Sequence, residues 1–261
     1  MQLIVTTGIY PTEATVQQAE SMAKTLQVPY VRRGKQSLDF LKASHKAELL
    51  VVVKKQGPVV ITPGGEYFFH LSMAELRINN LKNGKPDHMV EAMGLSAGMS
   101  VLDCTMGLAT DAIVASFVAG AAGQIAGIEH ALLIAQITEY GLRHFSAKDE
   151  AVTQALRRIQ VVWADYYEYL CHVPDKSFDI VYFDPMFRHP IHSSSNLKPL
   201  RYLADDRPLL PEAVQEACRI ARQRVVIKET RNSAEFDKFS LSGLYGGKYS
   251  SVHYGVIQVN G

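Results

Sequence analysis

Apolar and polar residues alternate in a way that predicts strands and helices in turn along the second half of the chain. From residue 100 onward, short apolar runs typical of buried strands are followed by stretches whose apolar residues recur every three or four positions. The predicted strands are Val101–Asp103, Gln124–Glu129, Ile159–Trp163, Phe178–Phe183, Arg224–Lys228 and a final β region, Ser251–Val259. The predicted helices are Asp111–Ala119, Ala131–Phe145, Glu150–Arg158, Tyr166–Leu170 and Pro211–Ala221. This alternation is typical of an α/β fold with a parallel sheet covered on both faces.

The first part of the chain has a different pattern. It predicts a strand over Leu3–Thr6, a helix from Thr12 that ends before Pro29, and later a strand-rich cluster with hairpin signals. The strands of that cluster are Leu49–Lys54, Val59–Thr62 and Glu66–Leu71, and helices over Met73–Leu81 and Asp87–Met93 follow. We therefore expect a small α+β domain over residues 1–85 and a larger domain over residues 86–261.

Composition supports a globular protein, and the distribution of charge separates its two parts. The chain has 261 residues, of which 47% are hydrophobic and 20% charged, with a net charge of +1. Residues 1–85 hold 11 Lys and Arg against 6 Asp and Glu, whereas residues 86–261 hold 16 against 20. A basic domain can hold a polyanion such as RNA through its phosphates. Clusters as short as Arg32-Arg33-Gly34-Lys35 and Lys54-Lys55 also fit an ordinary solvated surface.

Several classes of protein do not fit this sequence. No apolar run reaches the roughly 20 residues that a membrane span needs, and the opening residues lack an export signal, so we expect a cytoplasmic protein. Cys104, Cys171 and Cys218 lie far apart without a C-x-x-C pair, which argues against a disulfide framework or a zinc knuckle. The spacing of His189 and His192 is ligand-like but lacks a partner, so we expect no metal site.

Acidic residues follow four of the predicted strands. They are Asp103, Glu129, Asp165 and Asp184, and the carboxyl ends of parallel strands share one edge of a sheet, where ligands bind. Gly107 lies in the turn after the first of these strands and lets a ligand approach the backbone. Glu129 comes 22 residues later, where a carboxylate can accept two hydrogen bonds from a ribose diol. The pattern indicates an adenosyl cofactor.

The residues around this turn favour S-adenosyl-L-methionine over a dinucleotide. A pyrophosphate needs further glycines, and Ala109 stands where one is expected. Asp103 and Asp111 would repel a pyrophosphate, but they suit the positively charged amino group of S-adenosylmethionine. Each aspartate also has an ordinary structural alternative, since Asp111 can cap a helix and Asp103 can form a turn.

The fourth strand ends in Asp184-Pro185-Met186-Phe187, which resembles the D/N-P-P-Y/F motif of methyltransferases that act on exocyclic amines of nucleobases. In that arrangement, the Asp184 side chain and the Pro185 carbonyl accept the two N–H bonds of the amine, while Phe187 stacks on the extruded base. Catalysis is then mainly positioning, because the sulfonium is already a strong electrophile. The alternative is a plain strand-to-loop turn with a core phenylalanine.

Four segments together resemble the class I methyltransferases of the RsmJ type, over roughly residues 100–230. They are residues 103–112, Glu129-His130, Asp184–Phe187 and Arg224–Lys228. The resemblance implies a Rossmann-like class I methyltransferase sheet with helices on both faces and the cofactor S-adenosyl-L-methionine. It further implies methylation of the N2 amine of a guanine in small-subunit ribosomal RNA, so that the partner is ribosomal RNA or the small ribosomal subunit.

The resemblance also implies roles for individual residues. Thr110 and Asp111 would bind the methionine part of the cofactor, Glu129 with His130 the ribose, and Asp165 with Tyr166 the adenine. Asp184 would lie where donor and acceptor meet.

The chain departs from the family after its D-P-M-F motif, where a His-, Ser- and Pro-containing loop replaces a lysine-rich one. In this part, Lys198, Arg201 and Lys228 are candidates for contact with RNA phosphates, and Lys228 has the alternative of pairing with Asp184 or Glu229. We expect Trp163 in the core, with the adenine pocket as its alternative.

Three functions remain open at this point. The first is an S-adenosylmethionine-dependent N-methyltransferase that acts on an RNA base, foremost guanine N2. The second keeps the donor but acts on DNA, a protein or a small-molecule amine. The third is a non-catalytic RNA-binding or assembly factor, suggested by the basic residues 1–85.

Overall fold

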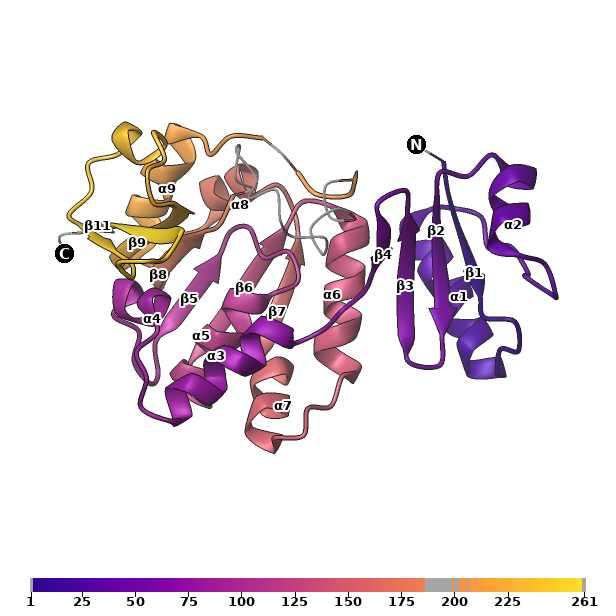
Figure 1. Ribbon diagram of the computed structural model, residues 1–261. Helices are drawn as coiled ribbons and strands as arrows, with labels where there is room; N and C mark the ends of the chain where they lie inside the picture. Colours follow the sequence, from indigo (N-terminus) through magenta and orange to yellow (C-terminus); the bar gives the residue numbers. More distant parts are fainter. Residues whose placement is uncertain (1, 186–198, 200–201, 206, 260–261) are drawn as a thin grey trace. The chain divides into compact units, whose positions relative to one another are not determined.

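The computed structural model describes residues 2–185, 199, 202–205 and 207–259 (Figure 1). The chain forms two compact units. The first consists mainly of Met1–His70 and Ala131–His144. The second consists mainly of Leu71–His130, residues 145–185 and the segment from Asp205 onward. The expected domain boundary after residue 85 stays a prediction.

The first unit is a small α+β structure. Its sheet has the order β1-β2-β3-β4, with β1 parallel to β2 and the other neighbours antiparallel. The strands are β1 (Leu3–Thr7), β2 (Leu49–Lys54), β3 (Gly57–Thr62) and β4 (Gly65–Tyr67), and the helices are α1 (Glu13–Leu26), α2 (Leu38–His45) and α6 (Leu132–His144). Apolar side chains of α2 pack on the sheet, where Leu41 joins a buried cluster with Ile4, Leu50 and Val52.

The second unit is built on a seven-stranded sheet of order β10-β11-β9-β8-β5-β6-β7. All of these strands except β10 are labelled in Figure 1. The strands are β5 (Ser100–Asp103), β6 (Gln124–Glu129), β7 (Ile159–Trp163), β8 (Phe178–Phe183), β9 (Ala221–Thr230), β10 (Gly243–Tyr245) and β11 (Val252–Gln258). Strands β5 to β9 are mutually parallel, and β10 and β11 are antiparallel to their neighbours. The predicted α/β fold with a parallel sheet is confirmed, and the four acidic strand ends do share one edge.

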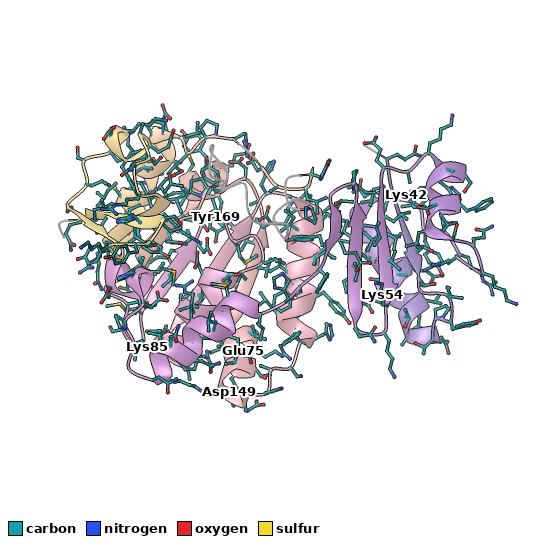
Figure 2. All side chains as sticks on the ribbon, viewed as in Figure 1. Lys42, Lys54, Glu75, Lys85, Asp149 and Tyr169 are labelled. Atoms are coloured by element: carbon teal, nitrogen blue, oxygen red, sulfur yellow. The ribbon has the colours of Figure 1, made fainter. Side chains whose placement is uncertain are left out.

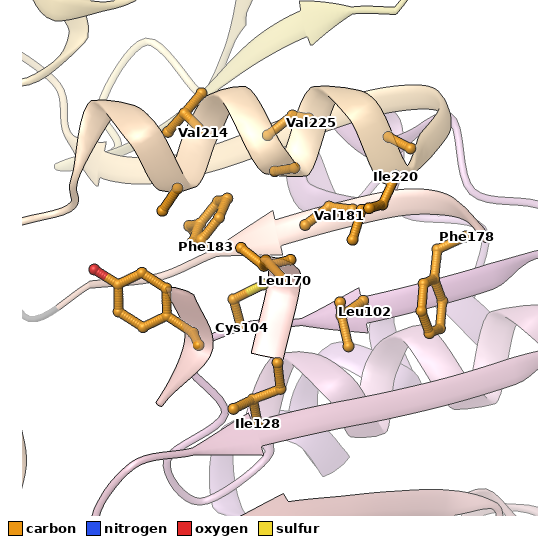
Figure 3. Close-up of a cluster of buried hydrophobic side chains, with 14 of the residues drawn as sticks. Leu102, Cys104, Ile128, Leu170, Phe178, Val181, Phe183, Val214, Ile220 and Val225 are labelled. Atoms are coloured by element: carbon orange, nitrogen blue, oxygen red, sulfur yellow. The ribbon is translucent and has the colours of Figure 1, made fainter. Parts of the chain in front are cut away.

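Helices flank this sheet. They are α3 (Ser72–Lys82), α4 (His88–Met93), α5 (Thr110–Ala119), α7 (Glu150–Arg157), α8 (Tyr166–His172) and α9 (Pro211–Ile220), with a short 3₁₀ helix η3 (Phe236–Lys238). Figure 3 shows the core between the sheet and α8 and α9, where Leu102, Val181, Phe183 and Val225 meet Leu170 and Ile220. Helix α5 packs against β5, β6 and β7.

The period-two alternation of strands places polar residues on the side away from that core. Val181 and Phe183 of β8 belong to the core with α8 and α9, so Tyr182 between them points to the opposite face. The same reasoning applies to Lys228, which follows Ile227 of the same core on β9. A phenol and an ammonium therefore meet the helix that begins at Thr110.

Some predicted elements need correction. The strand predicted over Glu66–Leu71 ends at Tyr67, β9 is longer than predicted, and the three-residue β10 is too short to leave a pattern. Trp163 is not a core residue: it ends the edge strand β7, and 60% of it is exposed.

Two findings concern the described residues alone. None of their helices is both long enough and apolar enough to cross a bilayer. Within the same part of the chain, no group of three or more His, Cys, Asp or Glu residues is arranged to hold a metal ion.

Candidate active site

The turn after β5 ties the ends of two strands together. The Asp103 carboxylate accepts a hydrogen bond from the backbone N–H of Thr105 (3.1 Å), and the Thr105 hydroxyl accepts one from the backbone N–H of Asp184 (2.6 Å). Asp103 is buried, and this burial, reinforced by the charge of Asp111, raises the pKa of its carboxyl group well above the usual value. Asp103 therefore supports the turn through its hydrogen bond to the backbone of Thr105.

Gly107 and Glu129 meet at the top of this turn. The backbone N–H of Gly107 donates to Glu129 Oε2 at 3.0 Å, across the 22 residues that separate them. Gly107 has a φ of 53°, and a Cβ placed there would have no atom within 4 Å, so the space over the turn is open. The backbone of the turn is thus accessible to a ligand beside the Glu129 carboxylate.

Ala109 ends the same turn in the left-handed conformation, with φ 61° and ψ 22°. This conformation costs a residue with a Cβ about 1–2 kcal/mol. A glycine at this position would adopt the same conformation without this cost. Thr110 and Asp111 follow as the first residues of α5.

Asp165 lies just after the end of β7, at the start of α8. Its carboxylate caps α8 by accepting from the backbone N–H groups of Tyr167 (2.9 Å) and Glu168 (3.1 Å), and it also accepts from Arg207 (2.7 Å). His130 is exposed, and its Nδ1 lies 3.8 Å from Asp165 Oδ2. The structure therefore brings His130 and Asp165 together.

The side chain of Tyr166 does not face the strand ends. It is buried in the core, where its ring packs edge-on against Phe183 with 5.9 Å between centroids. Only its backbone remains available to a ligand from this edge of the sheet.

Asp111 is the centre of a buried network of charges. Its Oδ1 accepts from Arg77, and its Oδ2 accepts from Tyr182 (2.7 Å) and Lys228 (2.9 Å). Although burial alone would raise the pKa of Asp111, the cations of Lys228 and Arg77 hold it below the usual range. Both oxygens are occupied, so Asp111 positions its neighbours and has little left to offer a ligand directly.

Arg77 extends the network to a second helix. Its guanidinium forms a bidentate pair with Asp87, with Nε–Oδ2 and Nη2–Oδ1 distances of 2.7 and 2.9 Å. Asp87 is also the N-cap of α4, because its Oδ1 accepts from the backbone of Met89 and Val90. Arg77 thereby joins α3, α4 and α5 through their charges.

Lys228 links this network to Asp184. Its Nζ lies 2.9 Å from Asp111 Oδ2 and 2.6 Å from Asp184 Oδ2. Of the two alternatives for Lys228, the geometry favours pairing with carboxylates, since its side chain is largely buried between them. Among the described residues, no group bonds Oδ1 of Asp184, which leaves that oxygen as an acceptor at the strand end.

The ionisation of Asp184 is finely balanced. Burial raises its pKa, Lys228 lowers it, and the negative charges of Asp111 and Glu229 raise it again, with a result of about 6. For Lys228 the balance is reversed: burial would lower its pKa, but Asp111 and Asp184 raise it above the usual value. Lys228 therefore carries a positive charge at neutral pH.

Comparison with known proteins now decides the kind of site. Residues 27–248 match the family described as "Putative SAM-dependent methyltransferase". The chain belongs to this family of S-adenosylmethionine-dependent methyltransferases. The match includes every one of the strand ends described above.

Two relatives are similar to this chain over almost its whole length. The chain is 38% identical to YpiP of Bacillus subtilis (strain 168), over 98% of this chain and all of that one. It is 29% identical to ribosomal RNA small subunit methyltransferase J of Coxiella burnetii (strain RSA 331 / Henzerling II), over 92% of each chain. That similarity extends well beyond the segment 100–230 on which the resemblance was based.

A solved structure shows the same fold. The S-adenosylmethionine-dependent methyltransferase NGO1261 of Neisseria gonorrhoeae has a TM-score of 0.65 to this chain and 17% identity, covering 99% of this chain and 96% of that one. This similarity confirms the Rossmann-like methyltransferase fold. The cofactor S-adenosylmethionine is confirmed by membership of the family.

The residues at the strand ends fit this cofactor. Glu129 offers a carboxylate beside an open glycine turn, as a ribose diol requires. The charge network holds three carboxylates, those of Asp87, Asp111 and Asp184, against the two cations of Arg77 and Lys228. With Asp184 ionised, the site keeps one excess negative charge, which favours a ligand with positive charge and disfavours a pyrophosphate.

Several residues of this site were not predicted from the sequence. Arg77, Asp87, Tyr182 and Thr105 all take part, and no role was predicted for any of them, although Thr105 lies within the segment 103–112. A signal existed for Tyr182, because a hydroxyl inside an otherwise apolar strand needs a partner when buried. Arg77 could be suspected from its place beside the buried residues Ala74 and Ile78 of α3.

Three predicted residues, Phe187, Lys198 and Arg201, lie outside the described part of the chain.

Proposed function

We propose that this methyltransferase transfers the methyl group of S-adenosylmethionine to an exocyclic amine of an RNA base, foremost N2 of a guanine in small-subunit ribosomal RNA. The observation that carries the proposal is the carboxylate of Asp184 at the end of β8. Lys228 holds its Oδ2, while Oδ1 has no partner among the described residues. An acceptor fixed in this way suits an N–H donor such as an amine.

Two groups of this chain would bind the amine. The Asp184 carboxylate and the backbone carbonyl of Pro185 each accept one N–H bond, which directs the nitrogen lone pair away from both oxygens. When bound, S-adenosylmethionine supplies an electrophilic methyl group on its sulfonium. Lys228 and Asp111 keep the Asp184 side chain in place, so the amine is positioned without a rearrangement of the site. Phe187 is proposed to stack on the base.

The cofactor contacts follow from the strand ends. Glu129 would accept the ribose hydroxyls, with His130 beside it, and the backbone of Gly107 and Thr110 would line the methionine part. Asp165, held by the start of α8, and the backbone of Tyr166 would lie at the adenine. Asp103 supports this arrangement through its bond to the backbone of Thr105, and Asp111 supports it through its bond to Lys228.

The first unit offers a surface suited to RNA. The α2 basic surface, as we call it, consists of Arg32 and Lys35 from the segment before α2, Lys42 of the helix and Lys46 at its C-cap, and Phe40 of the same helix is exposed. Among the described residues, no acidic side chain pairs with any of these four cations, in contrast to Lys54, which lies 3.6 Å from Glu66. Figure 2 shows Lys42 on α2 and Lys54 on the neighbouring sheet. Unpaired cations beside an exposed aromatic ring are typical of surfaces that bind RNA.

The relatives support RNA as the acceptor, since one of them at 29% identity bears the name of a ribosomal RNA small subunit methyltransferase. The test is transfer of tritium from labelled S-adenosylmethionine to naked ribosomal RNA, small ribosomal subunits, DNA and protein extract. We expect label in RNA or in the subunit RNA. Label confined to DNA or protein would contradict the proposal.

A further inference from the structure

The turn between β10 and β11 lies at the same edge of the sheet as Asp184. Val252, the first residue of β11, pairs with Thr230, the last residue of β9. Phe183, which precedes Asp184, pairs with Ile227, three residues before Thr230. Because β11 is antiparallel to β9, the residues before Val252 project beyond the carboxyl end of the parallel strands.

Strand geometry gives the distance between the backbone at the start of this turn and the backbone of Asp184. The positions of Asp184 and Val252 differ by two strand spacings of about 4.8 Å across the sheet and by about two residues of 3.3 Å along it. The turn therefore begins on the order of 12 Å from Asp184. That distance suits a contact with the nucleotides next to a base held at Asp184.

Several interactions fix the turn. The backbone N–H of Ser250 donates to the carbonyl of Gly247 (2.9 Å), which closes a four-residue turn with Lys248 and Tyr249 at its tip. Arg231 donates to the carbonyl of Lys248 (2.7 Å), and its backbone N–H donates to Ser251 (2.9 Å).

The glycines before the tip are required by close packing. A Cβ on Gly246 would approach the His253 ring to 2.6 Å, and one on Gly247 would approach His88 to 3.1 Å. The base of the turn is thus packed against two side chains of the second unit.

This fixed turn holds a large aromatic ring in solvent. Tyr249 is 91% exposed, more than any other large hydrophobic residue of the described chain, and the Lys248 ammonium lies 5.6 Å from the centre of its ring. Arg231 is exposed as well and places a second cation at the base of the turn. An exposed aromatic ring with one cation beside it and a second cation at the base of its turn matches the requirements of an unpaired nucleotide, which offers a flat base and a phosphate.

We propose that the Tyr249 turn, which comprises Gly247–Ser250 together with Arg231, binds the RNA strand beside the target nucleotide. Tyr249 stacks on a neighbouring unpaired base, and Lys248 and Arg231 contact the phosphates. This inference rests on the proposed function, because it takes the acceptor to be RNA.

The experiment compares Tyr249→Ala and Tyr249→Phe with the wild-type protein. The probe for binding is a fluorescein-labelled single-stranded RNA of mixed sequence, and the probe for activity is naked small-subunit ribosomal RNA with tritiated S-adenosylmethionine. Tyr249→Ala should weaken RNA binding about tenfold or more, as the loss of one base–aromatic stack does, whereas Tyr249→Phe should bind like the wild type. Tyr10→Ala is the matched control, because Tyr10 is 88% exposed but belongs neither to the Tyr249 turn nor to the α2 basic surface.

A second variant tests the phosphate contact. Lys248→Gln should lower the slope of log affinity against log salt by about 0.7, the value for one phosphate on a single strand. Loss of structure alone would not change this slope by the amount expected for one phosphate. Unchanged thermal unfolding of the variants confirms that the turn, and not the fold, was altered.

The outcomes separate this inference from the proposed function. If the wild-type protein methylates RNA and Tyr249→Ala binds and methylates it equally well, the Tyr249 turn is not an RNA site, although the proposed function stands. If Tyr249→Ala loses RNA binding while the wild type labels only DNA or protein, the turn binds RNA but the proposed acceptor is wrong. Wild-type RNA binding no tighter than that of Tyr249→Ala overturns the inference, and a protein partner then becomes the alternative.

Discussion

At the scale of single residues, Asp184 has the central role in positioning the amine in our proposal. Lys228 donates a hydrogen bond to Oδ2 of the Asp184 carboxylate. In our proposal, Oδ1 accepts a hydrogen bond from the amine that is methylated. The ability of Asp184 to bind an amine depends on its position and its charge. The hydrogen bond from its backbone N–H to the Thr105 hydroxyl fixes the position, and the balance between burial and Lys228 sets the charge.

Replacement of Asp184 by alanine should therefore abolish most activity. We expect Asp184→Ala to lower the single-turnover rate of methyl transfer at least about 100-fold, because the amine loses the acceptor that orients it. Asp175→Ala is the control, since Asp175 is an exposed carboxylate whose surface pair with Arg219 contributes little to stability. Full activity of Asp184→Ala would show that the amine is positioned by other groups.

The raised pKa of Asp184 predicts an acid limit to activity. Below a pH of about 6 the carboxyl group is protonated and can no longer accept as an anion, so activity is present above this pH and lost as the pH falls through it. The measurement is kcat/KM for RNA between pH 5 and 8.5, with an expected tenfold fall per pH unit below the midpoint. Lys228→Met should move the midpoint upward, because Lys228 lowers the pKa of Asp184. A flat profile down to pH 5 would contradict the assignment.

At the scale of elements, helices α3, α4 and α5 are joined through Arg77. Its bidentate pair with Asp87 and its bond to Asp111 are largely buried, because only 16% of the Arg77 side chain is exposed. Removal of one partner from such a pair leaves buried charge without compensation, which costs far more than the loss of a surface pair.

We expect Arg77→Met to lower the free energy of unfolding by about 3 kcal/mol at pH 7.5 in urea. Arg77 lowers the pKa values of Asp87 and Asp111 in the folded state, so this stabilisation is present above their unfolded value of 3.8 and is lost as the pH falls through their folded values. The difference between variant and wild type should therefore shrink in acid. Arg143→Ala is the control, since its pair with Glu139 on α6 is exposed, and a loss for Arg77→Met no larger than for this control would contradict the account.

Most elements of the fold could be predicted because their signals are local. Strands β2, β6, β7 and β8 begin and end where the apolar runs do, and the N-caps Thr12 and Asp87 begin their helices as expected. The convergence of acidic strand ends also follows from parallel strand order alone. Pairing across elements could not be predicted in this way: Arg77 reaches Asp111 from 34 residues away, and nothing near either residue specifies the other. Trp163 was misplaced because its strand is at the edge of the sheet.

At the scale of the whole molecule, we propose that the two units have separate tasks, methyl transfer and RNA binding. In our proposal, the second unit holds the methyltransferase site and the first carries the α2 basic surface, with Lys42 on α2 and Lys46 at its C-cap. Each can be tested separately, because a change in one surface leaves the other intact.

Neutralising the α2 basic surface should weaken RNA binding without affecting the cofactor. For the quadruple variant Arg32→Gln, Lys35→Gln, Lys42→Gln and Lys46→Gln, we expect the slope of log affinity against log salt to fall by about 0.7 for each RNA phosphate that is no longer neutralised. Affinity for S-adenosylmethionine, measured by calorimetry, should stay unchanged. Lys238→Gln is the control, because Glu235 already pairs with this lysine. An unchanged salt slope would show that RNA binds elsewhere.

The most direct test of the account is the chemical identity of the methylated product. The wild-type protein is incubated with small ribosomal subunits, with naked ribosomal RNA and with S-adenosylmethionine carrying a deuterated methyl group, and the RNA is digested to nucleosides for mass spectrometry. We predict one nucleoside with the deuterated methyl group on its exocyclic amine, foremost N2-methylguanosine, which is absent with Asp184→Ala. Label on a ring nitrogen, on carbon or on ribose, or no labelled nucleoside in either RNA, would contradict the account.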